Sequence, residues 1–378
     1  MDNSNLYEQL RILLSEGDNV IGLPKHEVVE KLLQNMYTEE EAKILTSSFE
    51  KVSTPTSLRN ISKLSGLPRE ELKPILEDMH YKGKLFRLGP LYMLLPYLPG
   101  GFEVYFSVNR DDPERIKKVA EAHLELRKLG FSYELSSSDY TIFRVFPAIK
   151  PTEKLIEVSN SLDVNYQVLP YEILQNYLSK AVPKLYAVIP CSCRTAAKLA
   201  GKPCKQTDEN FCVATGILAK SIIDQEIGQE VTLDELMEIM EKAEKEGLVH
   251  ESFNMQDTAM FVCNCCSCCC GFLRSVKDMH NYDSITKSNF EPEINQEKCN
   301  LCEVCMEICP MEAIYHHWPH KKDLSDNMML VRRDRCIGCG VCASNCPSDA
   351  ISLVKTRNNI PIKGQKELMA KRSKAKSH

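Results

Sequence analysis

The chain has 378 residues and 18 cysteines, all of them between Cys191 and Cys346. Cysteine makes up about a tenth of the second half, the level typical of a disulfide or metal scaffold. The net charge of −5 gives no global reason to expect nucleic-acid or anionic-lipid binding. The polar, acidic N-terminus and the absence of any long apolar stretch argue against a secretory signal or a membrane span. We therefore expect a cytoplasmic protein whose reduced thiols bind metal.

Residues 1–98 predict a helical, winged-helix-like domain. Apolar residues recur at helical spacing over 1–50, and Thr38 with Glu41 has the pattern of a capping box. Helices are expected at 40–51, 57–64 and 69–81, followed by a hairpin at 85–93, with Pro and Gly marking the turns. That order resembles a winged helix-turn-helix. Acidic side chains on the third helix would repel phosphates, which favours a docking or dimerisation module and makes nucleic-acid binding unlikely without excluding it.

Residues 99–190 predict a small α/β region. Strands are expected at 102–108, 140–146 and 185–189, and helices at 113–129 and 171–180. No glycine-rich nucleotide loop is present. Further on, Thr232 and Glu235 predict a capped helix over 232–246, between two groups of cysteines. The tail, 355–378, is basic and poor in apolar residues beyond Lys363, so we expect it to be disordered.

Two cysteine runs of identical spacing form the strongest motif. Each has the pattern CxxCxxCxxxCP, in which three cysteines surround one [4Fe–4S] cluster and the fourth binds the neighbouring cluster. Zinc sites use paired hooks around a single ion, a pattern that these runs do not have. The first predicted cluster is held by Cys299, Cys302, Cys305 and Cys346, and the second by Cys336, Cys339, Cys342 and Cys309.

Segment 291–354 resembles the bacterial-type two-cluster ferredoxin domain. Short strands are expected before and after each run, which makes the segment a twofold internal repeat. The runs also differ from each other: Leu301 and Glu303 stand in the first run where Gly338 and Gly340 stand in the second.

The ten other cysteines form two groups in region 191–290. The first group has enough thiols for a third [4Fe–4S] cluster, with Arg194 nearby to offset its charge: Cys191, Cys193, Cys204 and Cys212. The second group is too crowded to bind one cubane with every thiol, so it predicts a fourth cluster or a site shared with the first group: Cys263, Cys265, Cys266, Cys268, Cys269 and Cys270. A shared site with an open iron is also possible.

Taken together, these features predict an α+β multidomain protein. Its parts are a helical, winged-helix-like domain (1–98), an α/β region (99–190), a cysteine-rich region (191–290), a two-[4Fe–4S] ferredoxin fold (291–354) and a basic tail (355–378). The arrangement is similar to that of multicluster 4Fe–4S ferredoxin-type proteins of anaerobes. That resemblance implies electron transfer, as a carrier or an oxidoreductase subunit, between donor and acceptor proteins. The cofactors expected are two [4Fe–4S] clusters and one or two more.

Two other functions remain open at this stage. One is a multicluster reductase with an open iron–sulfur site at Cys191–Cys270, and the other is a redox-sensing winged-helix transcription regulator. The sequence singles out no catalytic residue, and it predicts neither the redox partners nor the oligomeric state.

Overall fold

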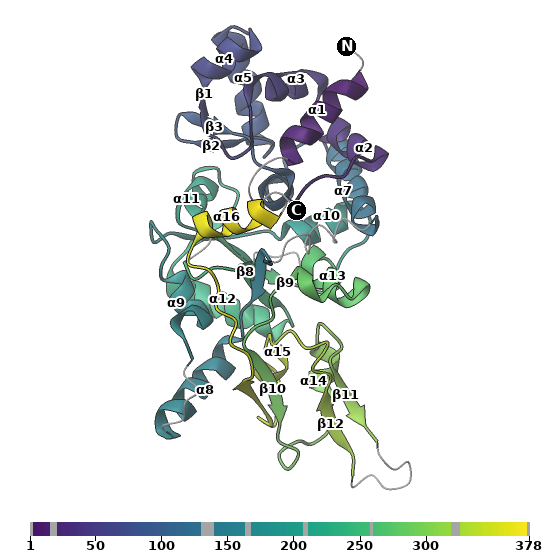
Figure 1. Ribbon diagram of the computed structural model, residues 1–378, viewed down its shortest axis with the longest axis vertical. Helices are drawn as coiled ribbons and strands as arrows, with labels where there is room; N and C mark the ends of the chain where they lie inside the picture. Colours follow the sequence, from purple (N-terminus) through teal and green to yellow (C-terminus); the bar gives the residue numbers. More distant parts are fainter. Residues whose placement is uncertain are drawn as a thin grey trace.

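The computed structural model describes residues 3–15, 21–129, 140–162, 168–206, 211–257, 260–318 and 326–375. It is a mixed helix-and-sheet protein, elongated in the view of Figure 1, with an N-terminal helical unit at one end. A six-stranded sheet lies in the middle, and the segment with the two cysteine runs lies at the other end. Among the described residues, no helix is long and apolar enough to span a membrane.

The N-terminal unit follows the predicted order of elements. Thr38 caps α3 as expected, because its side chain accepts from the Glu41 amide at 3.2 Å while Glu41 accepts from the Thr38 amide at 2.7 Å. A small antiparallel sheet has the strand order β1-β3-β2. The elements are α1 (Asn3–Ser15), α2 (Glu27–Met36), α3 (Glu39–Ser48), β1 (Thr56–Ser57), α4 (Leu58–Ser65), α5 (Arg69–Tyr81), β2 (Phe86–Leu88) and β3 (Leu91–Met93).

The strand predicted at 102–108 is wrong, since these residues form helix α6 (Phe102–Val108), which follows the irregular turn η1 (Tyr97–Gly101). The alternation of apolar residues suggested a strand, but the aromatic residues also match one helical face. The rings of Phe102 and Phe106, one helical turn apart, lie 5.1 Å from each other, and Tyr105 is fully buried beside them. Burial of these rings against neighbouring helices therefore overrides the strand-like pattern.

The central sheet is antiparallel throughout, with the order β4-β8-β9-β6-β5-β7. It combines strands from both sides of the boundary that the sequence analysis placed at residue 190. The α/β region and the cysteine-rich region therefore share one sheet. The strands are β4 (Phe143–Val145), β5 (Tyr186–Ile189), β6 (Cys212–Thr215), β7 (Gln229–Val231), β8 (Val249–Phe253) and β9 (Phe261–Cys265).

Helices α11 and α12 pack on strands of this sheet. The capped helix expected at 232–246 is α12, and Thr232 and Glu235 exchange the predicted hydrogen bonds. The helix expected at 171–180 is divided between two short elements, η3 and α9. The helices are α7 (Pro113–Lys128), α8 (Ile149–Leu162), η3 (Pro170–Glu172), α9 (Leu174–Leu178), α10 (Ser192–Leu199), α11 (Gly216–Asp224), α12 (Leu233–Lys245), α13 (Gly271–Met279) and η4 (Tyr282–Ser284).

The C-terminal segment has the predicted repeat of strand, helix and strand. Its first and last strands, β10 (Phe290–Ile294) and β13 (Ile351–Lys355), pair with each other, and so do β11 (Ile314–His317) and β12 (Met328–Val331). Short helices α14 (Val304–Ile308) and α15 (Val341–Ser344) lie within the two cysteine runs. The segment packs against α8 and α12 of the central part.

The tail, predicted to be disordered, instead contains helix α16 (Gln365–Ala375). The tail is attached to the rest of the protein from Ile362 onward, where the Ile362 carbonyl accepts a hydrogen bond from the Gln256 amide at 2.8 Å. Leu368 is fully buried, and Lys371 lies over the Tyr140 ring. Two apolar side chains and a strand-like contact therefore hold a segment whose composition suggested disorder, while residues 376–378 lie outside the described part.

Candidate functional site

The first cysteine run and the end of the second line one hollow. Its lining includes Cys299, Cys302, Cys305 and Cys346. Burial, followed by the charges of the three other thiols, raises the pKa of Cys305 to about 11. The fold thus brings together the four residues expected to bind the first cluster.

Cys309, from the first run, lies instead within electrostatic reach of the second run. Burial is the main cause of the raised pKa of Cys336, Cys339 and Cys342, and in each case the charge of Cys309 raises it further. The fourth cysteine of each run therefore belongs spatially to the other run, which is the arrangement of ligands in two-cluster ferredoxins.

Backbone geometry repeats between the runs. The amide of Ala313 donates to Cys309 Sγ at 3.2 Å, and the amide of Ala350 donates to Cys346 Sγ at 3.3 Å. Three equivalent pairs of residues have positive φ angles, and in two of these pairs a glycine of the second run stands opposite a non-glycine residue of the first. The pairs are Leu301 with Gly338, Glu303 with Gly340, and Glu312 with Asp349. Such amide–sulfur bonds and tight turns suit thiolates that bind an iron–sulfur cluster, so the donor set fits the predicted group.

Gly338 is the repeat position that tolerates substitution least. Its φ is +73°, and an added Cβ would lie 2.2 Å from the Phe290 carbonyl oxygen. We expect Gly338→Ala to destabilise the C-terminal domain by about 2–4 kcal/mol, from left-handed strain together with overpacking, and to lower iron content. Denaturant unfolding and iron analysis measure both effects. Gly89→Ala is the control, because Gly89 has φ +58° and nothing within 4 Å of the added atom. An equal loss in the two variants would contradict the steric argument.

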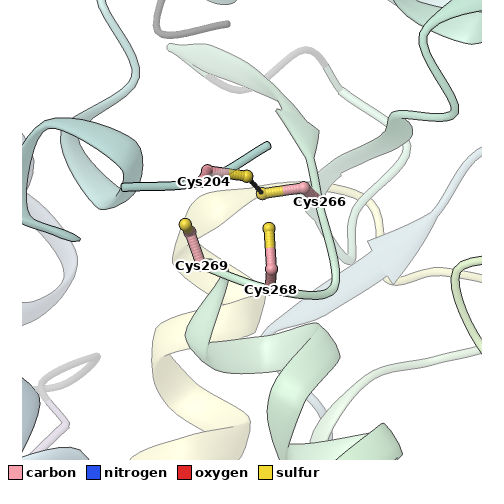
Figure 2. A group of neighbouring side chains, drawn as sticks. All are labelled: Cys204, Cys266, Cys268 and Cys269. Carbon is pink, nitrogen blue, oxygen red and sulfur yellow. Dashed lines mark hydrogen bonds between the residues drawn. The ribbon is translucent and has the colours of Figure 1, made fainter. Parts of the chain in front are cut away.

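The ten remaining cysteines divide differently from their order in the sequence. Cys204 lies with three cysteines of the second group, whereas the sequence analysis placed it with Cys191, Cys193 and Cys212. All sulfur atoms of this four-thiol group lie within 4.8 Å of one another, and the side chains point toward a shared centre (Figure 2): Cys204, Cys266, Cys268 and Cys269.

The other six thiols form a second, buried constellation, which we call the six-thiol group: Cys191, Cys193, Cys212, Cys263, Cys265 and Cys270. Cys191 contacts Cys193 and Cys212. Cys212 contacts Cys263, which contacts Cys265 in turn. Cys265 contacts Cys270, whose charge also acts on Cys193. The thiols therefore follow one another in a chain of contacts from Cys193 to Cys270.

Strand alternation explains this division. Cys263 and Cys265 lie two residues apart on β9, so their side chains point to the same face of the sheet. Cys212, at the start of β6, is on the strand next to β9. Cys266 lies just past the end of β9 and joins the other group, because the chain turns after Cys265.

Arg194 lies between the two thiol groups and is almost fully buried. Its guanidinium acts on Cys191 and Cys212 of the six-thiol group and on Cys266 of the four-thiol group. Contacts with the Cys193 and Cys212 thiols, assisted by Arg194, hold the pKa of Cys191 well below its usual value. The sequence analysis placed this arginine beside one group, whereas in the structure it compensates negative charge in both.

Glu251 is a possible ligand that the sequence analysis missed. Its carboxylate is buried on β8, and Oε2 lies 3.8 Å from Cys270 Sγ. Glu251, Cys265 and Cys270 place their ligand atoms within 4.8 Å of one another, and Oε1 of Glu251 lacks a hydrogen-bond partner in the described part of the chain. Burial, and then the charges of Cys270 and Cys263, raise the pKa of Glu251 well above its usual value. The sequence held little signal for it, because β8 also carries the polar residues His250 and Ser252 on either side of Glu251.

A buried polar network joins this region to the C-terminal domain. Ser344 on α15 donates to Glu244 Oε2 at 2.6 Å, and His250 Nε2 lies 3.0 Å from Glu244 Oε1. The other ring nitrogen, His250 Nδ1, lies 2.5 Å from Oδ1 of Asn264, which stands between Cys263 and Cys265. Although burial alone would raise it, hydrogen bonds from His250 and Ser344 keep the pKa of Glu244 below its usual value. One hydrogen-bonded network therefore joins residues next to the expected cluster ligands of the C-terminal domain to residues next to the six-thiol group.

Residues 298–350 match the family model of the 4Fe-4S dicluster domain. No curated protein and no solved structure matches the chain. The matched segment contains all eight cysteines of the two runs. The protein therefore carries a ferredoxin-type iron–sulfur domain at its C-terminal end, and this match favours electron transfer over the reductase and the regulator.

Proposed function

We propose that the protein relays single electrons between redox partner proteins. The path runs through two [4Fe–4S] clusters in the C-terminal domain and a further iron–sulfur cluster in the six-thiol group. The eight cysteines of the runs hold the first two clusters in the crossed pattern described above. The third cluster takes four ligands from the six thiols, and Glu251 is available as a further ligand. Each cluster accepts one electron, and burial together with amide–sulfur bonds sets its potential.

The buried network of Ser344, Glu244, His250 and Asn264 is the observation that carries this proposal. A second polar contact supports it, because the Asn345 side chain donates to the Glu244 carbonyl at 2.8 Å. The Ala148 amide, just before α8, also donates directly to the Cys339 carbonyl at 2.9 Å. Such contacts keep the C-terminal clusters at a constant separation from the six-thiol group, which a relay requires and two independently moving domains would lack.

The N-terminal unit serves as the docking module in this proposal. Its order of helix, strand, two helices and hairpin, with the β1-β3-β2 sheet, supports the winged-helix interpretation. The exposed side chains of α5 include Glu70, Glu71 and Asp78 beside Arg69 and Lys73. This mixed surface suits a protein partner better than DNA, which requires a continuous basic face. A reducing cytoplasm is the compartment that suits so many free thiols.

The relay is tested by removing one cysteine ligand from each of the two C-terminal clusters. In the double variant Cys302→Ala/Cys339→Ala, we expect a protein-sized donor such as a reduced ferredoxin to reduce the third cluster much more slowly than in the wild type. Dithionite, a small reductant that reaches clusters directly, should still reduce it. Anaerobic stopped-flow absorption and EPR of the reduced state follow both reactions.

The control is Ser267→Ala, which leaves every proposed ligand in place. Equal rates with the protein donor in the double variant and the wild type would contradict the relay. Iron and sulfide analysis checks the number of clusters, since three clusters contain about 12 iron atoms. A value near 8 would remove the third cluster from the proposal.

A further inference from the structure

The four-thiol group has the shape of a site for one metal ion. Its sulfur atoms all lie within 4.8 Å of one another, and Cys204 Sγ is 3.5 Å from Cys266 Sγ. Four thiolates bound to one tetrahedral ion at about 2.3 Å each are separated by about 3.8 Å. A four-iron cube separates its thiolates more widely, because each thiolate binds a different iron atom.

The C-terminal cysteines provide a comparison within the same molecule. Among the described residues, only the four-thiol group and the Glu251 group place three or more possible ligands within that distance. The four cysteines expected to hold the first cubane are also among the described residues, but their sulfur atoms do not all lie within 4.8 Å of one another. They line the hollow noted above. The fold therefore spaces the thiols of the first expected cubane more widely than those of the four-thiol group.

The chain around the four-thiol group supports a closed coordination shell. Three of its cysteines come from the turn between β9 and α13, and this turn is closed by a hydrogen bond from the Cys270 amide to the Cys266 carbonyl at 3.1 Å. The fourth, Cys204, follows α10 and receives a hydrogen bond on sulfur from the Gln206 amide at 3.3 Å. Four protein ligands fill a tetrahedral site and leave no position for a substrate, as in structural sites.

Charge and exposure agree with a small site near the surface. Cys268 is exposed and Cys204 half-buried, while Cys266 and Cys269 are buried. Four thiolates around a divalent ion carry a net charge of −2, and the Arg194 guanidinium contacts Cys266 on the buried side. The ion would join the loop after α10 to the turn that also carries ligands of the six-thiol group.

We propose that Cys204, Cys266, Cys268 and Cys269 bind a single divalent metal ion, zinc or iron, in tetrahedral thiolate coordination and without inorganic sulfide. This site differs from the cubane expected at the second cysteine group. It does not depend on the proposed relay, since the relay uses the six-thiol group and the C-terminal clusters.

The test uses the full-length protein, purified anaerobically, with the exposed ligand changed in Cys268→Ser. We expect the loss of one metal ion per chain with no change in acid-labile sulfide. Loss of zinc identifies a zinc site, and loss of one iron together with its thiolate–iron absorption identifies an iron site; both support a mononuclear centre. Cobalt(II), added to protein stripped of that ion, should show the visible bands of tetrahedral thiolate coordination in the wild type and lose them in the variant.

Ser267→Ala, in the same turn, is the matched control and should keep the ion. Loss of about four irons and four sulfides from Cys268→Ser would show a cubane and overturn the proposal, and so would unchanged metal content. Cys204→Ser, on the other segment, provides an independent test and should lose the same single ion. A corresponding loss of four irons from Cys263→Ala bears only on the relay, so the two proposals fail separately.

Discussion

Cys309→Ala is expected to abolish the cluster held by Cys336, Cys339 and Cys342, although Cys309 lies in the other run. The cause is the crossed arrangement, in which Cys309 is within reach of the second run while Cys346 lines the hollow of the first. Iron content should fall by up to about four atoms per chain, or the cluster should convert to a three-iron form. EPR of the reduced protein measures which signal is lost.

The assignment comes from comparing variants. The spectrum of Cys309→Ala should match that of Cys336→Ala and differ from that of Cys302→Ala. The spectrum of Cys346→Ala, by contrast, should match that of Cys302→Ala and differ from that of Cys336→Ala. If Cys309→Ala resembled Cys302→Ala instead, each run would bind its own cluster, and the crossed ligand sets would be wrong.

Lys84→Met should strongly destabilise the N-terminal unit. Lys84 Nζ lies 3.1 Å from Glu41 Oε1 and 3.1 Å from Asp111 Oδ2, and all three side chains are buried. These contacts join α3 to the segment before α7. Removing the cation leaves Glu41 without its buried counter-ion and Asp111 with only the more distant Lys82, at 4.0 Å, and breaking a buried pair in this way costs about 3–5 kcal/mol. Urea unfolding followed by far-UV circular dichroism measures the loss.

The loss of stability in Lys84→Met should depend on pH in a predictable direction. Although burial alone would raise it, Lys84 and the Tyr105 hydroxyl hold the pKa of Asp111 below its usual value. In the wild type, the stability from Asp111 is therefore present above the usual aspartate pKa and is lost as pH falls through the lower, folded value. Without Lys84, burial acts on the Asp111 carboxyl without this counter-ion and favours its protonated form. The difference in stability between variant and wild type should thus be larger at pH 8 than at pH 5.

Lys43→Met is the matched control, because Lys43 pairs with Glu39 at 2.6 Å on the exposed surface of α3. Such a pair contributes about 0–1 kcal/mol. A loss for Lys84→Met as small as that for Lys43→Met would show that the buried pair stabilises the unit no more than an exposed one.

Helix caps and cysteine spacing were readable from the sequence because they depend on nearby residues. The capping boxes at Thr38 and Thr232 formed as predicted. The expectations at 102–108 and in the tail were wrong for one shared reason. Both segments take their structure from what they pack against, aromatic neighbours for α6 and residues 255–257 for the start of α16.

The candidate sites follow the same distinction. The sequence by itself determined the iron–sulfur character of the C-terminal domain, because each run places its first three ligands within one local loop and the fourth at a constant spacing. Only the tertiary structure decided how the other ten cysteines divide. The turn after β9 and the position of the loop after α10 place Cys204 with Cys266, Cys268 and Cys269, apart from the six-thiol group. These contacts join distant segments, and the order of cysteines along a chain does not specify which of them face one another across a sheet.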